Sequence, residues 1–241
     1  MKKLGIVGGA SWNSTALYYE HINKGVAARL GGLHSARLVI ESLDCEDDYA
    51  GFHRRGDWAG GEKIVIQACE RLRDAGAEGL ILTSNTMHKH YDAVAAALPL
   101  PVLHIGEAAA ERIAADGRRT VALLGSRVTM IEPHVRSHFE ARGITLAPIE
   151  DSWVGEVDRI IYEELAAGRV VRESQRKLKT LITELGKKRV EAIVLGCTEL
   201  VLAVDPRANV LPVYDTTAIH ARKAVEWILS ERENGTVAAA A

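Results

Sequence analysis

The stretch Leu195-Gly196-Cys197-Thr198-Glu199 places a thiol, a hydroxyl and a carboxylate directly after an apolar run. The run Ala192-Ile193-Val194-Leu195 predicts a buried parallel strand, and ligands of open α/β sheets bind at the carboxyl ends of such strands. A cysteine there would lie near the start of the next helix, whose dipole favours the thiolate. We therefore expect Cys197 to be reactive, although a buried structural cysteine would fit the same pattern.

A second stretch repeats this pattern about half a chain earlier. The residues Gly79-Leu80-Ile81-Leu82 form an apolar run that leads into Thr83-Ser84-Asn85-Thr86. In both stretches a glycine, Gly76 or Gly186, ends a helical segment before the strand, as is common at helix C-termini. The sequence thus predicts a duplicated architecture in which two strand ends carry polar side chains.

A glycine-rich turn, Gly8-Gly9-Ala10-Ser11, follows the predicted strand Lys2–Val7. It precedes a predicted helix that ends near Leu30 and that Ser14 or Thr15 could cap. Such a turn can bind phosphate through backbone N–H groups. Neither GxGxxG nor GxxxxGK[ST] is present, so a nucleotide site is not favoured. A carboxylate site and a purely structural turn both remain open.

Three motifs together resemble the aspartate/glutamate racemase family: Gly8-Gly9-Ala10-Ser11-Trp12, Ser84-Asn85-Thr86-Met87-His88 and Leu195-Gly196-Cys197-Thr198-Glu199. The resemblance continues in order through Pro212-Val213-Tyr214-Asp215-Thr216 and covers nearly the whole chain. It implies two similar three-layer α/β domains with largely parallel sheets, related by pseudo-symmetry, with the active site in the cleft between them. It also implies amino-acid racemisation without pyridoxal phosphate or another cofactor, using one cysteine on each face of Cα.

The chain departs from this family at the first cysteine, which is replaced by Ser84. The resemblance therefore implies Cys197 on one face, and Ser84 or water on the other. A hydroxyl is a much poorer base than a thiolate. Three explanations stay open: a naturally asymmetric racemase, an engineered cysteine-to-serine variant that binds the amino acid, or a one-thiol activity such as that of the family's arylmalonate decarboxylases. A protein that only binds an amino acid is a further class.

We expect substrate contacts from the strand ends and from one loop, at Ala10, Ser11, His53, Asn85, Thr86, Thr129, Thr198 and Glu199. Hydroxyl, amide and backbone N–H donors at the strand ends could stabilise charge that develops on the substrate carboxylate. Glu199 could orient the site or merely cap a helix.

The polar segment 44–58, which we expect to be a loop, contains His53-Arg54-Arg55. The resemblance implies that a basic residue here reaches the distal carboxylate of aspartate or glutamate. An acidic residue, near Asp48, stands at the usual position of the family's arginine. Ala166 and Ala167 stand where the family often has a lysine. A solvated charged loop without function is the alternative.

Composition excludes several classes of protein. The net charge of −2 shows no bias toward polyanions, so we expect no nucleic-acid partner. Cys45, Cys69 and Cys197 form no disulfide framework, and the apolar run 4–7 is too short for an export signal. We expect a cytoplasmic enzyme with a small amino-acid substrate, no membrane contact and no metal, because His88 and His90 are too few ligands. The resemblance implies a homodimer.

The predicted domains are residues 1–98 with 214–230, and residues 99–213. Leu98-Pro99-Leu100-Pro101 marks the expected crossing, with the strand Val102–Ile105 beginning the second half. Residues 231–241 lose hydrophobic periodicity and are predicted to be a disordered tail.

Overall fold

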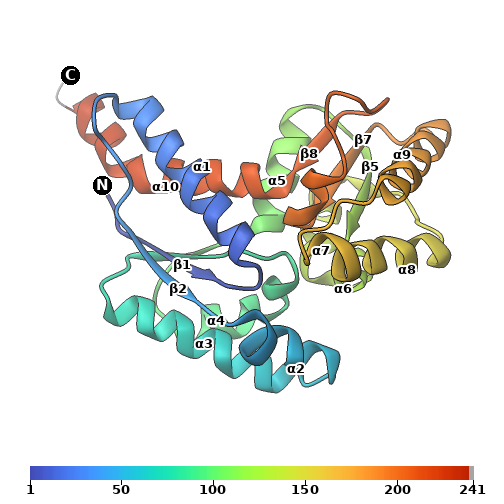
Figure 1. The fold of residues 1–241 in the computed structure, drawn as a ribbon. Helices are drawn as coiled ribbons and strands as arrows, with labels where there is room; N and C mark the ends of the chain where they lie inside the picture. The colour runs from blue at the N-terminus through green and yellow to red at the C-terminus, as the bar shows by residue number, and fades with distance from the viewer. Residues whose placement is uncertain (239–241) are drawn as a thin grey trace. The chain divides into compact units, whose positions relative to one another are not determined.

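The computed structural model describes residues 1–238 and divides into two compact units. One unit contains Met1–His104 and the chain from His220 onward, and the other contains Ile105–Ile219. Each has a four-stranded parallel sheet with helices on both faces, which confirms the predicted α/β class (Figure 1). Within the described residues, no helix is both long and apolar enough to cross a membrane.

The first unit has the strand order β2-β1-β3-β4. Its elements are β1 (Leu4–Gly8), α1 (Trp12–Leu30), β2 (Leu38–Ser42), the π-helix η1 (Cys45–Ala50), α2 (Gly51–Arg54), α3 (Trp58–Asp74), β3 (Gly79–Leu82), the 3₁₀-helix η2 (Thr86–His90), α4 (Tyr91–Ala97), β4 (Val102–Leu103) and most of α10 (Thr216–Ala238).

Side chains alternate between the two faces of this sheet, as the pleat requires. Leu4 and Ile6 of β1 pack in a cluster with buried residues of α1 and α10. Val7 packs in a separate cluster with residues of α3 and α4. Because both faces of the sheet are covered, the free positions for polar chemistry lie at the strand ends.

The second unit has the corresponding strand order β6-β5-β7-β8. Its elements are α5 (Ile105–Ala115), β5 (Thr120–Gly125), α6 (Arg127–Ile131), α7 (Pro133–Glu140), β6 (Thr145–Leu146), α8 (Asp151–Arg159), the π-helix η3 (Ile160–Leu165), α9 (Arg172–Lys187), β7 (Ala192–Gly196), the 3₁₀-helix η4 (Thr198–Leu202) and β8 (Val213–Asp215).

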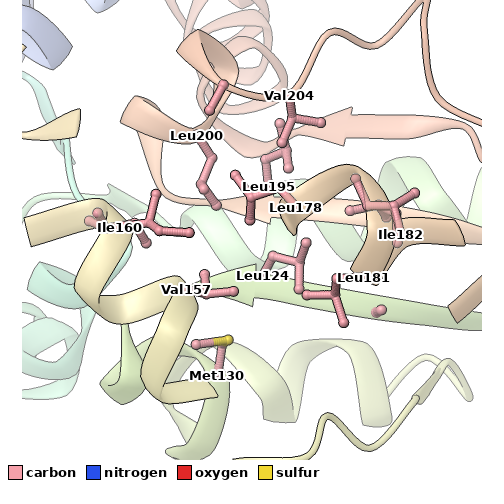
Figure 2. Packing of buried hydrophobic residues seen from close by; sticks show 14 of the residues in the cluster. Leu124, Met130, Val157, Ile160, Leu178, Leu181, Ile182, Leu195, Leu200 and Val204 are labelled. Carbon is pink, nitrogen blue, oxygen red and sulfur yellow. The ribbon is translucent and has the colours of Figure 1, made fainter. Parts of the chain in front are cut away.

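The main core of this unit surrounds the end of β7. Leu195 of β7 and Leu200 of η4 are both fully buried and pack with Leu124 of β5 and with residues of α8, η3 and α9 (Figure 2). The backbone on both sides of Cys197 is thus anchored by buried leucines. Such anchoring holds the thiol in place without contributing chemistry of its own.

The boundaries of the two units differ from the predicted ones at both places where the chain passes from one unit to the other. β4 pairs with β3 through Leu80↔Val102 and Ile81↔Leu103, so the prediction that this strand begins the second half is wrong. The Leu-Pro-Leu-Pro segment delimits only the connection between α4 and β4. Near the C-terminus, β8 still pairs with β7 of the second unit. The chain therefore passes back to the first unit at His220 rather than at residue 214.

Two local predictions also need correction. The segment 44–58 is mostly helical, because the Asp44 carboxylate accepts hydrogen bonds from the backbone N–H groups of Glu46 and Asp47, both at 2.9 Å, and starts η1. The cap of α1 is Ser11, not Ser14 or Thr15. At the other end, α10 continues to Ala238 through much of the predicted tail, and residues 239–241 lie outside the described residues.

Candidate functional site

Cys197 lies at the carboxyl end of the second sheet, where β5 and β7 end side by side. Gly125 and Gly196 are paired in register. A Cβ atom at Gly125 would lie 2.7 Å from the Gly196 carbonyl oxygen, so only glycine allows this close approach. The predicted strand end is confirmed, and its tight backbone leaves Cys197 directly beyond the last paired residue.

The Cys197 thiol is hydrogen-bonded to a carboxylate two residues away. Its Sγ donates to Oε2 of Glu199 at 3.0 Å, and the hydroxyl of Thr198 donates to the same oxygen at 2.9 Å. Thr198 and Glu199 are each 8% exposed. The three side chains expected from the sequence thus form one connected group, in which Glu199 is the shared acceptor.

This environment keeps the sulfur protonated. Burial raises the pKa of Cys197 well above 9, and the adjacent negative charge of Glu199 raises it further. Backbone N–H groups of Glu199 and Leu200 act in the opposite direction but do not compensate. The expectation of a thiolate at a helix start is therefore wrong for this structure, because η4 is only a five-residue 3₁₀-helix and a carboxylate lies beside the thiol.

Two further hydroxyls lie at this edge of the second sheet. Thr129 is fully buried in α6, and its Oγ1 lies 3.1 Å from Oγ of Ser126, the cap of that helix. Thr217 follows the end of β8, is 2% exposed, and its hydroxyl oxygen has no hydrogen-bond partner among the described residues. Sequence analysis missed Thr217, although its place just after a strand is the same signal that identified Ser84 and Cys197.

In the first unit, Ala10 and Ser11 lie in the turn after β1. Gly9 has φ +90°, and a Cβ atom there would clash with the backbone of Leu43, so the turn requires glycine. The N–H of Gly9 donates to the Thr15 hydroxyl at 2.9 Å. Ser11 caps α1 by accepting a weak bond from the N–H of Ser14 at 3.4 Å.

Ser84 follows β3 at the same edge of the first sheet. The preceding residue, Thr83, donates from both its backbone N–H and its hydroxyl to the Val7 carbonyl of β1, each at 3.0 Å. Ser84 is partly exposed, whereas Asn85 and Thr86 are 4% and 7% exposed. The structure therefore places Ser84, Asn85 and Thr86 at one strand end beside the Gly9 turn.

His53 lies in an aromatic cluster that includes His90 of η2, the short helix that follows Ser84 and Asn85. Its ring centroid lies 4.0 Å from that of Tyr49 and 4.4 Å from that of Trp58, with His90 of η2 at 5.9 Å. Burial lowers the pKa of His53 to about 4, with smaller contributions from His90 and Lys89. At neutral pH His53 is therefore uncharged and cannot attract a carboxylate as a cation.

The neighbouring arginines already have partners in the described structure. Arg54 forms an ion pair with Glu46, and both side chains are well exposed. The guanidinium of Arg55 lies 5.0 Å from the ring centroid of Phe52. An exposed ion pair contributes little stability, so Arg54 can exchange Glu46 for another carboxylate at small cost.

His88 and His90 face different surroundings. The ring of His88 contacts His104 and His220, whereas Nδ1 of His90 lies 3.9 Å from the Glu62 carboxylate. Within the described part of the chain, no group of three His, Cys, Asp or Glu side chains is arranged to hold a metal ion.

Comparison with known proteins gives a consistent result. The profile of a family described as Asp/Glu/hydantoin racemase matches residues 7–224. A crystal structure titled as a putative Asp/Glu racemase from Yersinia pestis is 40% identical, covers 95% of this chain and 100% of its own, and has a TM-score of 0.88. An aspartate racemase homologue from Pyrococcus horikoshii OT3 is 32% identical, with 95% and 99% covered and a TM-score of 0.79. The broad specificity amino-acid racemase RacX of Bacillus subtilis (strain 168) is 24% identical over 70% of this chain and 73% of its own.

Proposed function

Because the chain belongs to the Asp/Glu/hydantoin racemase family, we propose that it racemises an acidic amino acid, aspartate or glutamate, without pyridoxal phosphate. Cys197 moves the Cα proton on one face, and Ser84 or a water molecule beside it acts on the other. The observation that carries this proposal is the hydrogen-bonded group of Cys197, Thr198 and Glu199 at the end of β7.

Glu199 gives Cys197 access to both protonation states. The neutral thiol is ready to donate its proton to a carbanion at Cα. To remove a proton from Cα, the thiol first passes its own proton to Oε2 of Glu199, 3.0 Å away, and the resulting thiolate then takes the Cα proton. Thr198 holds the same oxygen in place by its 2.9 Å hydrogen bond, so the acceptor stays aligned with the sulfur.

The carbanion needs stabilisation, because no cofactor with an electron sink takes part in the proposed reaction. Its charge is shared with the substrate α-carboxylate, which we assign to the backbone N–H groups of the turn at Ala10 and Ser11 and to the side chains of Asn85 and Thr86. Donors that are fixed before the reaction stabilise such charge without reorganisation. The buried positions of Asn85 and Thr86 fit this requirement.

Proton transfer is less efficient on the face of Cα that Ser84 serves. A serine hydroxyl holds its proton far more tightly than a thiol, so it is a poor base at neutral pH. We therefore assign the slow step to proton transfer at this face. The reaction proceeds in both directions, but a carbanion formed by Cys197 returns to its starting configuration more often than it inverts.

The acidic specificity is assigned to Arg54. His53 is neutral in its aromatic cluster, whereas Arg54 is an exposed cation that already binds a carboxylate, that of Glu46. The distal carboxylate of the substrate would replace that of Glu46. This exchange retains a charge-assisted hydrogen bond and costs little, since the existing pair is exposed.

The test is to incubate the purified chain with L- and D-aspartate and L- and D-glutamate in D₂O, and to follow Cα deuteration by NMR and optical rotation together. Parallel samples with arylmalonates are assayed for CO₂ release. Racemisation that is lost in Cys197→Ala supports the proposal. CO₂ release without Cα exchange would replace it with the decarboxylase, a second candidate favoured by the neutral thiol of Cys197, which suits protonation of an enediolate.

A further inference from the structure

The peptide that joins Ser84 to Asn85 is held by a buried histidine. Nδ1 of His88 lies 2.8 Å from the Ser84 carbonyl oxygen. A carbonyl can only accept a hydrogen bond, so Nδ1 must carry the proton. The side chain of His88 is 1% exposed, and its backbone N–H donates to the Asn85 carbonyl at 3.2 Å as part of η2. The bond to Ser84 is thus a separate, side-chain restraint on the strand end.

The orientation of this carbonyl determines the orientation of the next N–H. The peptide is trans, as are all peptide bonds described in the structure. In a trans peptide the C=O and N–H bonds point in opposite directions. When His88 holds the Ser84 carbonyl toward the buried side, the Asn85 N–H is directed to the opposite side. A flipped peptide would exchange the donor for an acceptor at this strand end.

The His88 ring is itself held by its neighbours. It packs edge to face against His104 at 4.6 Å between centroids and lies 5.6 Å from His220. His220 donates from Nε2 to the Leu103 carbonyl and accepts from the Tyr18 hydroxyl, both at 2.9 Å. His104 and His220 are 3% and 0% exposed. This packing restricts rotation of the His88 ring and so fixes the direction of its Nδ1–H.

We propose that His88 is a positioning residue, whose Nδ1–H holds the Ser84–Asn85 peptide so that the Ser84 side chain and the Asn85 N–H are both presented at the carboxyl edge of the first sheet. This inference rests on the proposed function, in which Ser84 serves one face of Cα. A structural role alone would predict only a loss of stability when His88 is replaced. A positioning role predicts a loss of turnover that a suitable donor restores.

Two substitutions separate these roles. His88→Asn keeps an N–H donor on the atom bonded to Cγ, the position that Nδ1 occupies in histidine. His88→Leu has a similar branched shape but no donor. We expect His88→Leu to lower kcat for racemisation by roughly 10- to 100-fold, the scale of a misplaced catalytic group, with KM changed less than about threefold. His88→Asn should retain kcat within about threefold of the parent.

A third variant controls for stability. Val94→Ala removes buried methyl groups from α4 and leaves both partners of the His88–Ser84 hydrogen bond in place, so it should lower thermal stability without lowering kcat. Equal loss of kcat in the Asn and Leu variants, or a comparable loss in Val94→Ala, would overturn the inference. If the parent chain shows no racemisation at all, the proposed function has failed, and that outcome is distinct from either of these.

A measurement on the unmodified chain covers the case in which His88→Leu does not fold. ¹⁵N NMR of the histidine side chains reports which ring nitrogen carries the proton. We expect the His88 signal to show the Nδ1–H form, with slow exchange of that proton with solvent. The Nε2–H form would mean that the bond to the Ser84 carbonyl is absent, and the inference would be wrong whatever the activity of the chain.

Discussion

His220 should make the first unit sensitive to acid. Its ring is fully buried, and both ring nitrogens are hydrogen-bonded within the protein. Nε2 donates to the Leu103 carbonyl, while Nδ1 accepts from the Tyr18 hydroxyl. Burial lowers the pKa of His220 from 6.5 to about 4, despite the opposing effect of the Leu103 carbonyl. A second proton on this ring would reverse the bond to Tyr18, whose hydroxyl would have to accept it, and would place a charge in a fully buried site.

The direction of the effect follows from proton binding. Above pH 6.5 neither the folded nor the unfolded chain carries the extra proton on His220. Between pH 6.5 and 4 the unfolded chain binds it and the folded chain does not, so the free energy of unfolding falls as the pH falls. The full loss corresponds to roughly 3 kcal/mol, reached as the pH falls through about 4, and about 2 kcal/mol of it has occurred by pH 5.

The assay compares the parent with His220→Gln, whose amide N–H can still donate to the Leu103 carbonyl but does not titrate in this range. Urea unfolding of both proteins is followed at pH 7.5 and pH 5.0. Between these two values the parent should lose about 2 kcal/mol more than the variant. Other titrating groups, including His53, act in both proteins and cancel in the difference. Parallel losses in the two proteins would refute the assignment of a depressed pKa to His220.

Three predictions concern activity. Cys197→Ala should fold normally and lose roughly 10²–10⁴-fold in racemisation rate, the usual contribution of one proton carrier; a rate within a few-fold of the parent would remove Cys197 from its role. Arg54→Ala should lower kcat/KM for aspartate by roughly 10- to 100-fold, as expected for loss of a hydrogen bond to a charged group, while His53→Ala should weaken binding only through lost packing; equal turnover of alanine and aspartate by the parent would show that no distal carboxylate is recognised. In D₂O, one enantiomer should gain deuterium at Cα with retention faster than it racemises, and Ser84→Cys should narrow this gap by supplying a better proton carrier; matched exchange and racemisation rates for both enantiomers of the parent would contradict the asymmetric mechanism.

Much of the fold could be predicted from local sequence patterns. Apolar runs followed by small polar residues identified β3 and β7 and placed Ser84 and Cys197 just beyond their ends. These predictions succeeded because a strand that is buried on both faces must be apolar throughout, and the chain can become polar only where the sheet ends. The two-sheet architecture followed from the repetition of this pattern.

The partner of each strand could not be predicted in the same way. Val102 and Leu103 have the composition of a strand for either sheet, and only hydrogen bonding to β3 assigns them to the first unit. Pairing is a contact between segments distant in the sequence, and a proline-rich connection carries no information about it. The same reason explains why the chain passes back to the first unit at His220 rather than at residue 214.

Order along the chain is enough to fix which groups stand at the strand ends: a thiol, a hydroxyl and a carboxylate follow β7. The protonation state of the thiol depends on packing in three dimensions. Burial and the Glu199 carboxylate make Cys197 a neutral thiol, and burial among aromatic rings makes His53 uncharged. Packing likewise places His104 and His220 against the ring of His88. A pKa depends on the solvent and charge around a group, and those are fixed by packing between segments that the sequence keeps far apart.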